Sequence, residues 1–368
     1  MDITVIGGGH GCHASAAEFT EKGHRVRWWR RDGAQHESVR AAGGLSIKDY
    51  RGTRRVPVAV MTADLRAAVH GAELIVIPLP ATTHESLAPQ LAEVLEDGQV
   101  VFLPPGTFGS FLFARALERH RPGANVSFAE TGTLPYLVRK HGPAEMVVSG
   151  YATRLPTGVI PRRNAAHALG VLRRAYSSIE DCGDALSGAL MNAGPIIHPP
   201  LILMNAGPLE HFPRWDIHKE GTQPAIRRTT DALDDERIAV REVLGYGPPH
   251  FPLRHHYAKD GEEWMYGRAA HERLTDSGDW REKIDLLQHR YMLEDLALGL
   301  SLFSSIGRWA GCRMPIAEGM LAIGSAIVGR DLYASGRTLE NLGLAQLTRT
   351  QMQALMQEGP QVFGGHHV

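Results

Sequence analysis

The sequence contains few cysteines, carries almost no net charge and has no long apolar run. Its three cysteines, Cys12, Cys182 and Cys312, stand far apart, and none belongs to a CxxC pair. This spacing argues against a disulfide framework and against a cysteine-based zinc site. A chain with a few isolated thiols suits a reducing compartment, so we expect a cytoplasmic protein.

The positive and negative charges nearly cancel. The formal net charge is −1, with 39 basic and 40 acidic residues, so no strong field attracts nucleic acid or an anionic membrane surface. The apolar runs are shorter than the roughly 18 residues that a membrane-spanning helix needs. The opening MDITVI shows no signal-peptide pattern. We therefore expect neither a nucleic-acid partner nor a membrane partner.

Histidine pairs occur at 255–256 and 366–367, but neither pair has a carboxylate or a third ligand at useful spacing. A protein zinc site needs three or four ligands. The sequence therefore predicts no metal site.

The length of 368 residues indicates two domains. In the first, an apolar strand at 3–6, a glycine cluster, a helix at 15–22 and a strand at 25–29 have the size of one βαβ unit. Further strands at 74–79 and 100–103 flank a helix at 86–95. This alternation predicts an α/β fold with a doubly wound, Rossmann-type parallel sheet, which we assign to residues 1–184.

Strand-like runs become rare after about residue 185. Helices are expected at 230–244, 280–295, 296–310 and 348–357, so residues 185–368 should form a mainly α-helical domain. Residues 245–279 are rich in Gly, Pro, His and Trp and show no periodicity, which indicates a long functional loop or an irregular insertion.

The loop Gly7-Gly8-Gly9-His10-Gly11-Cys12 follows the first strand and opens the first helix. Gly7 permits a tight turn, and Gly9 lets a pyrophosphate approach the free N–H groups of the helix. Position 12 needs a small residue for helix–strand packing, and cysteine is only slightly larger than alanine. A strand, a helix and a second strand surround the loop, so we expect it to bind a nicotinamide dinucleotide.

The residues after the second strand distinguish the two cofactors. NAD enzymes place an acid there for the ribose hydroxyls. If Trp29 ends the strand, Arg30 takes that place, and Arg30 with Arg31 could bind a 2′-phosphate bidentately. We therefore favour NADP(H). NAD(H) stays open, because Asp32 could serve the ribose while both arginines are ordinary solvated charges.

Two further turns should lie at the same edge of the sheet. Pro80 to His84 follow the strand at 74–79, and Pro105-Gly106 follow the strand at 100–103. We expect Pro80, His84, Pro105 and Gly106 to line the nicotinamide side. His84 is as readily explained as a neighbour of a helix cap.

Two segments of the second half carry candidate substrate chemistry. His198 precedes a double proline in an apolar run, which holds it rigidly, and Arg290 to Asp295 form a dense charged patch before the apolar stretch 296–306. A histidine with a carboxylate can move a proton, and an arginine fork can bind a substrate carboxylate. These are the groups that a keto-acid reductase needs. A lone histidine in apolar surroundings is nevertheless more often structural.

These segments occur in an order that resembles the opine dehydrogenases, the octopine/nopaline dehydrogenase family, over nearly the whole chain. The resemblance rests on the glycine loop, on residues 80–84, on Glu130-Thr-Gly-Thr-Leu-Pro-Tyr136 with Arg139, on 192–205, on Glu220-Gly221 with 234–237, and on 290–295. Each motif is weak alone, and together they are fairly specific.

The resemblance implies a reductive condensation of an α-keto acid, pyruvate-like, with the amino group of an amino acid. It implies that His198 is the catalytic histidine, Asp295 its acidic partner and Arg290 the arginine that binds a substrate carboxylate. Asn205 and Glu220 fall in segments that face the substrate pocket. The chain departs from NAD-specific members at Arg30, which replaces an acid, and Cys12 stands where a glycine or alanine is usual.

Two other functions stay open. One is a reductase of a keto or hydroxy acid without an amine substrate, like ketopantoate reductase or the β-hydroxyacid dehydrogenases, which usually rely on a catalytic lysine. Only Lys219, Lys259 and Lys283 precede Asp295 in the second half, outside any recognisable motif. The other is a non-catalytic NADP-binding sensor. The sequence leaves the amino acid, the keto acid and the oligomeric state, a homodimer among them, undetermined. Aromatic residues of the irregular region are candidates for a side-chain pocket or for core packing: Trp215, Tyr257, Trp264 and Tyr266.

Overall fold

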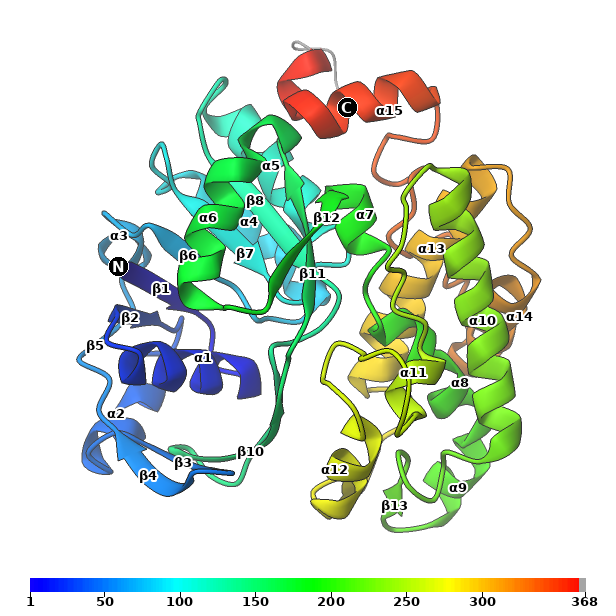
Figure 1. Ribbon diagram of the computed structural model, residues 1–368, viewed down its shortest axis with the longest axis horizontal. Helices are drawn as coiled ribbons and strands as arrows, with labels where there is room; N and C mark the ends of the chain where they lie inside the picture. The colour runs from blue at the N-terminus through cyan, green and yellow to red at the C-terminus, as the bar shows by residue number, and fades with distance from the viewer. Residues whose placement is uncertain (364–368) are drawn as a thin grey trace. The chain divides into compact units, whose positions relative to one another are not determined.

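The computed structural model describes residues 1–363 and divides the chain into two compact units (Figure 1). Among the described residues, the first unit holds 1–79, 83–189 and 354–363. The second holds residues 80–82 and 190–353. The chain thus passes into the second unit for three residues, 80–82, before it returns to the first.

The first unit is built on an eight-stranded sheet in the order β12-β11-β8-β7-β6-β1-β2-β5. Neighbouring strands are parallel, except for the antiparallel pair β8 and β11. The chain moves outward in one direction from β1 and in the other from β6, so ligands are expected beyond the carboxyl ends of these two strands. The predicted Rossmann-type sheet is confirmed. Its strands are β1 (Asp2–Ile6), β2 (Arg25–Trp29), β5 (Val60–Thr62), β6 (Leu74–Val76), β7 (Val100–Leu103), β8 (Ser127–Thr131), β11 (Leu155–Ile160) and β12 (Ile179–Asp184).

Helices cover both faces of this sheet because its inner strands are apolar on both sides. Val100 and Phe102 of β7 belong to a core that includes residues of α1 (His10–Glu21) and α6 (Ala165–Ala175). Leu103 points the other way and lies against Gly109, the first residue of α5 (Gly109–His120). The remaining α-helices of this unit are α2 (Ala34–Ala41), α3 (Leu65–Val69), α4 (His84–Ala92), which packs on α5, and α7 (Ala185–Ala189).

A second, four-stranded sheet was not predicted. Its order is β4-β3-β10-β9, and α1 contacts β3, β9 and β10. The sheet places residues near 140 beside the glycine loop, which matters for the cofactor site. Its strands are β3 (Leu45–Asp49), β4 (Gly52–Val56), β9 (Tyr136–Lys140) and β10 (Glu145–Tyr151).

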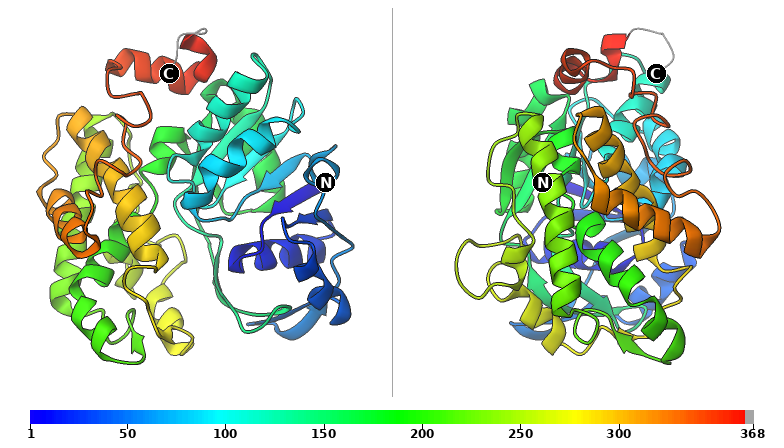
Figure 2. Two further views of the ribbon diagram at one scale, coloured as in Figure 1. Left: turned by 180° about the vertical axis from the view of Figure 1, so that it is seen from behind. Right: turned by 90° about the vertical axis from the view of Figure 1, so that its right-hand side faces the viewer.

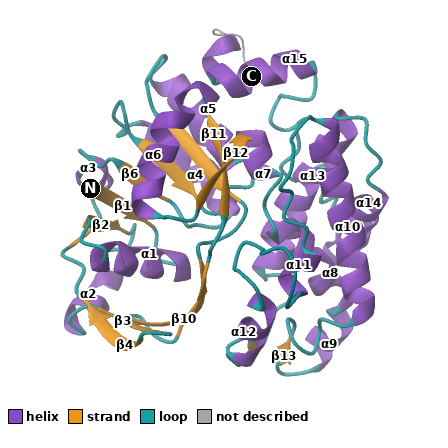
Figure 3. Cartoon of the chain, in the orientation of Figure 1, coloured by secondary structure: helices purple, strands orange, loops and turns teal. Residues whose placement is uncertain are grey.

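The second unit is mainly helical, as predicted (Figure 3). The long helix α10 packs against α8, α13 and α14, and the right-hand view of Figure 2 shows it in yellow-green along this bundle. The elements are α8 (Gly194–Met204), α9 (Ala206–His211), β13 (Trp215–Asp216), α10 (Pro224–Val243), α11 (Arg254–Tyr257), α12 (Ala270–Asp276), β14 (Arg281–Glu282), the π-helix η3 (Tyr291–Leu300), α13 (Ser301–Trp309) and α14 (Pro315–Val328); α15 (Arg349–Glu358) follows.

The helix expected at 280–295 is wrong over most of its length. Arg281 and Glu282 pair with β13 in a two-stranded ribbon, and helical structure begins only at Tyr291. The charged side chain of Arg281 bonds to Glu220 beside that ribbon, a long-range contact that local periodicity does not reveal. The irregular stretch 245–279 contains only the short helices α11 and α12.

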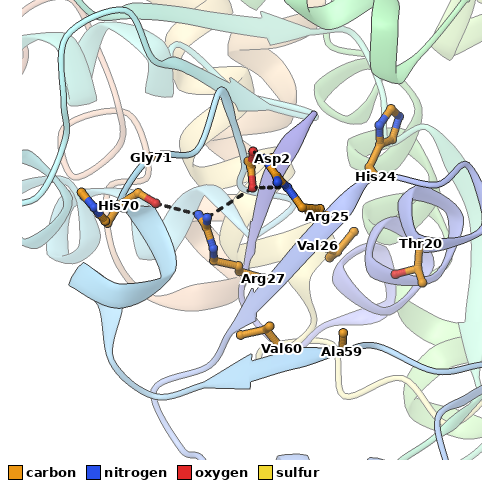
Figure 4. Close-up of a pocket in the computed structure, with 10 residues that line it drawn as sticks. All are labelled: Asp2, Thr20, His24, Arg25, Val26, Arg27, Ala59, Val60, His70 and Gly71. Atoms are coloured by element: carbon orange, nitrogen blue, oxygen red, sulfur yellow. Dashed lines mark hydrogen bonds and ion pairs between the residues drawn. The ribbon is translucent and has the colours of Figure 1, made fainter.

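A hollow of about 630 Å³ lies at the amino ends of β1, β2 and β5 (Figure 4). Asp2 faces Arg25 and Arg27 in it, and Arg27 also bonds to the carbonyl of His70. This is the edge opposite to the one where such sheets bind cofactors. Within residues 1–363, no group of three histidine, cysteine or acidic side chains is arranged to hold a metal, and no helix is long and apolar enough to cross a membrane. The pair at 366–367 lies outside the described residues.

Candidate cofactor and catalytic sites

The glycine loop turns directly from β1 into α1. Gly7 has φ +115°, a conformation that side chains other than glycine rarely adopt. A Cβ built on Gly9 meets no atom within 4 Å, so the space in front of it is open. Gly9 is also the N-cap of α1 and provides no side chain to bond the first-turn N–H groups. First-turn N–H groups without a side-chain cap, at the head of a twelve-residue helix, suit an anion.

Two residues after Gly9 contribute packing. Gly11 lies so close to Leu134 that a Cβ would come within 2.6 Å of it. Cys12 is completely buried, and its Sγ lies 3.5 Å from the carbonyl oxygen of Ile6. Burial raises the pKa of the Cys12 thiol to about 12, so it stays protonated. Cys12 therefore supports the loop from the protein side.

Strand β2 ends at Trp29, and Arg30 is the first residue beyond it. The Trp28 indole donates a 2.6 Å hydrogen bond to the carbonyl of Gly7 and so supports the loop from below. The Arg30 guanidinium lies 5.7 Å from the Trp28 ring and against Gly8, where a Cβ would come within 2.5 Å of its central carbon. Arg31 is exposed. The Asp32 carboxylate accepts a hydrogen bond from the N–H of Ala34, the first residue of α2.

Residues of β9 reach the same loop. The backbone N–H of Lys140 donates to His10 Nδ1 at 3.1 Å, across 130 positions. The neutral His10 ring therefore carries its proton on Nε2. The Lys140 ammonium lies 3.4 Å from the carbonyl oxygen of Gly8. No sequence motif pointed to Lys140.

The turn after β7 is held by a buried carboxylate. Glu130 accepts hydrogen bonds from the backbone N–H groups of Phe108 and Ser110 and from the Ser110 hydroxyl. It also fills the space where Gly106 would carry a Cβ. Thr107 and Phe108 both have left-handed φ, at +51° and +60°. Such strain is concentrated at functional sites, which suits a turn at the cofactor edge.

His84 follows Thr83, the N-cap of α4, which agrees with its interpretation as a neighbour of a helix cap. His84 is fully buried between α4 and α5, edge-on to Phe113 and against Gly109. Residues 80–82 pack within the second unit. There the N–H of Ala81 donates to Glu294 and its carbonyl accepts from Arg337. Pro105 belongs to the strained turn next to Gly106.

The second unit brings together two residues that are 97 positions apart. His198 lies on α8 and Asp295 on the π-helix η3, and Nδ1 of the histidine is 2.7 Å from Oδ2 of the carboxylate. The side chains are 16% and 4% exposed. Gly194 lets the helices approach, because a Cβ there would collide with the other carboxylate oxygen of Asp295. A π-helix at this point is itself typical of functional sites.

The electrostatics of this pair favour a neutral histidine. Burial raises the pKa of Asp295 to about 6, with Arg290 and His289 opposing the rise. Burial and the positive charge of Arg290 lower the pKa of His198 well below its usual range. Near neutral pH, His198 Nδ1–H therefore donates to ionised Asp295, and Nε2 is left as a base. No described residue is hydrogen-bonded to that Nε2 in the structure.

Tyr291 is a second neighbour of the histidine that sequence reasoning missed. Its ring stacks on His198 with 3.6 Å between centroids and 9° between planes. Its hydroxyl lies 2.8 Å from Nε2 of buried His218. Tyr291 therefore fixes the plane of the His198 ring from the side, while Asp295 fixes its rotation.

Arg290 is half-exposed and lies 3.3 Å from the carboxylate of Glu294 one turn on. Glu294 is buried, which raises its pKa, although Arg290 opposes that rise. The guanidinium thus pairs with Glu294, is also influenced by the charge of Asp295, and keeps half of its side-chain surface exposed. It can bind a second carboxylate from solution.

Asn205 and Glu220 have structural partners. The Asn205 amide donates to the carbonyls of Leu201 and Gly221 and accepts from the Trp215 indole. Glu220 accepts from the backbone N–H of Asp216 and pairs with Arg281. Both side chains hold the loop around β13. Trp264 and Tyr266 are buried, and the Tyr257 ring lies under the Arg227 guanidinium.

The pair His198–Asp295 belongs to a segment with known relatives. Residues 181–328 match the family described as NAD/NADP octopine/nopaline dehydrogenase, alpha-helical domain. The chain is a relative of the opine dehydrogenases. Residues 2–104 match the N-terminal part of NAD-dependent glycerol-3-phosphate dehydrogenase, in accord with the Rossmann-type sheet. By type, this relative of the opine dehydrogenases is a nicotinamide-dependent oxidoreductase.

Whole-chain comparisons agree with the two family matches. An opine dehydrogenase of Arthrobacter sp. (strain 1C) is 26% identical over 362 residues, which cover 96% of this chain and 98% of that protein. Octopine dehydrogenase in complex with NADH and agmatine has the same fold, with TM-score 0.72, 19% identity and coverage of 100% and 99%. NADP+-bound yersinopine dehydrogenase gives TM-score 0.63, 14% identity and coverage of 97% and 98%. The family resemblance and the fold class predicted from the sequence are confirmed.

Proposed function

We propose that the protein is an NADPH-dependent reductase of the opine dehydrogenase type. It joins the amino group of an amino acid to the carbonyl carbon of an α-keto acid, pyruvate-like, and reduces the resulting imine. One observation carries this proposal: a histidine and a carboxylate 97 positions apart form a 2.7 Å pair within the matched helical domain. Related structures support this choice of substrates, since octopine dehydrogenase is described with NADH and pyruvate in one structure and with NADH and L-arginine in another.

The first unit fits a dinucleotide cofactor. The open space at Gly9 and the first-turn N–H groups of α1 suit a pyrophosphate, and Arg30 suits a 2′-phosphate. The alternative in which Asp32 serves the ribose has less support, because its carboxylate is bonded to Ala34 and Gln35. When bound, the reduced cofactor supplies a hydride to the substrate carbon.

His198 moves the protons of the condensation. Its Nε2 takes one proton from the substrate ammonium, which frees the amine to attack the keto carbon. The imidazolium, stabilised by Asp295, then returns that proton to the developing oxygen. A second proton follows the same route as water leaves. Two protons pass from nitrogen to oxygen, and His198 ends each cycle neutral, so the balance needs no other acid or base.

Arg290 binds a substrate carboxylate with its half-exposed side chain. Arg290 is the residue that directly precedes the π-helix, five positions before Asp295. An arginine at this position holds the substrate carboxylate near His198 and Asp295 and so orients the keto carbon for attack. Orientation of this kind supplies a large part of the rate enhancement in two-substrate reactions.

A reductase of keto or hydroxy acids without an amine is less well supported. Such enzymes usually employ a lysine, and Lys259 pairs with Glu272 while Lys283 is exposed. A sensor would have no use for a buried histidine–carboxylate pair. The test is the rate of NADPH oxidation with keto acid alone, amino acid alone and both. Oxidation that requires both supports the proposal, and oxidation with keto acid alone overturns it.

A further inference from the structure

The glycine loop is flanked by two cations from different sheets. Arg30 follows β2 of the large sheet, and Lys140 ends β9 of the small one. Both approach Gly8: the Lys140 ammonium lies 3.4 Å from its carbonyl oxygen, and the Arg30 guanidinium packs against its Cα. The two side chains therefore converge on one residue of the loop.

Neither cation forms an ion pair within the described residues, although the charge of Asp32 raises the pKa of Arg30 against the larger effect of burial. In the part of the chain that the structure describes, no carboxylate lies within ion-pairing distance of Arg30 or Lys140. Arg30 is buried, and each pKa is lowered by burial; the charge of Arg30 lowers that of Lys140 further. Two unpaired cations in a half-buried place repel each other. Their arrangement is favourable when an anion binds both.

The position of the pair indicates which anion it is. The N–H groups of α1, at Gly9 and beyond, suit the pyrophosphate. Arg30 takes the place at the end of β2 that faces the adenosine ribose in this fold class. Lys140, like Arg30, contacts the loop at Gly8, the residue before Gly9.

We infer that Lys140 is a ligand of the cofactor's 2′-phosphate, which it shares with Arg30. This rests on the proposed use of NADPH. The small sheet thereby gains a role in cofactor selection, because it carries Lys140 to the loop. His10 secures that placement, since its Nδ1 accepts the hydrogen bond from the Lys140 backbone.

The test is equilibrium binding of four probes to purified full-length protein by titration calorimetry. The probes are NADPH, NADH, adenosine 2′,5′-bisphosphate and 5′-AMP. The variants are Lys140→Met, Lys140→Arg as the conservative rescue, and Lys48→Met, which removes an exposed lysine from β3 of the same small sheet. Thermal unfolding of each variant checks that it folds.

We expect Lys140→Met to raise Kd for NADPH and for the bisphosphate about tenfold, the loss of one charge-assisted contact. NADH and 5′-AMP should change less than about twofold. Lys140→Arg should recover most of the affinity, and Lys48→Met should match wild type. Equal losses for NADH and NADPH would place Lys140 on the pyrophosphate and overturn the inference, as would no loss for either. A wild-type protein that binds the bisphosphate no better than 5′-AMP would instead refute the proposed NADPH preference.

Discussion

His198 Nδ1 lies 2.7 Å from Asp295 Oδ2, across 97 positions of the chain and between an α-helix and a π-helix. The contact joins a neutral base to a buried carboxylate that can stabilise its protonated form. Each residue alone has a mundane explanation, as a buried histidine or a charged helix start. Under the proposed function, they together act as the proton carrier, beside the half-exposed Arg290.

Removal of either member of this pair should slow turnover strongly and leave cofactor binding intact. We expect His198→Ala and Asp295→Asn each to lower kcat by about 10²–10⁴-fold. Kd for NADPH should stay within about twofold of wild type, because the glycine loop is untouched. Steady-state kinetics and fluorescence titration measure the two quantities. Full activity of His198→Ala would show that another group moves the protons.

The pH profile should have an acid limb set by Asp295. Burial raises the pKa of the Asp295 carboxyl group to about 6. The ionised form is therefore present above pH 6 and is lost as the pH falls through this value. The kcat/KM for the keto acid should therefore be level near pH 7–8 and fall about tenfold per unit well below 6. In Asp295→Asn the remaining activity should lose this limb. A limb that persists unchanged in the variant would assign it to another group.

Tyr291 should act as a positioning residue for His198. Tyr291→Phe keeps the ring stack and loses the hydroxyl bond to His218, whereas Tyr291→Leu removes the stack. An aromatic stack is worth about 0.5–1.5 kcal/mol, so we expect kcat to fall up to about tenfold in the leucine variant and little in the phenylalanine variant. Equal damage in both would show that the hydroxyl bond to His218 is the important contact.

Cofactor preference should depend on Arg30 more than on Arg31. Arg30 is buried against Gly8, while Arg31 is exposed. Arg30→Ala should weaken the binding of NADPH by tenfold or more, about 1.4 kcal/mol, and leave the binding of NADH nearly unchanged. Arg31→Ala is the matched control and should have a smaller effect. If Arg30→Ala weakens both cofactors equally, Arg30 does not read the 2′-phosphate.

The stability of the first unit should depend on Glu130. Its buried carboxylate accepts hydrogen bonds from the backbone N–H groups of Phe108 and Ser110 and from the Ser110 hydroxyl at the turn into α5. Glutamine in either orientation would turn its amide N–H₂ toward at least one of these backbone N–H groups. Glu130→Gln should lower the free energy of unfolding by about 2–3 kcal/mol. Glu180→Gln, which breaks a partly exposed pair with Arg154, should cost less than about 1 kcal/mol. Urea unfolding measures both, and equal midpoints would contradict this role for Glu130.

The sequence predicted features that depend on local pattern. The loop between β1 and α1, the end of β2 at Trp29 and the helical second half all follow from short-range spacing and apolar periodicity. The small sheet was missed because β3 and β4 are short and rich in charged residues, which do not read as strands. Residues 281–282 were misassigned because their pairing partner lies some 65 positions earlier, beyond any local window.

The candidate site divides in the same way. His198 and Asp295 could be named from their family resemblance, although neither periodicity nor composition reveals that they touch. Lys140 and Tyr291 were missed because each acts through a contact made by the fold: one from β9 to the glycine loop, the other across the face of an imidazole. The scarcity of lysine was the one signal that could have drawn attention to Lys140.

The most direct test of the proposed function is the initial rate of NADPH oxidation, followed by the absorbance of NADPH, with pyruvate alone, each amino acid of a panel alone, and pyruvate with each amino acid. Oxidation should require both pyruvate and an amino acid, and His198→Ala should show almost none with any of these pairs. The product should be a secondary amine that carries both carboxylates, which mass spectrometry identifies. Oxidation with pyruvate alone, yielding lactate, would contradict the proposed function.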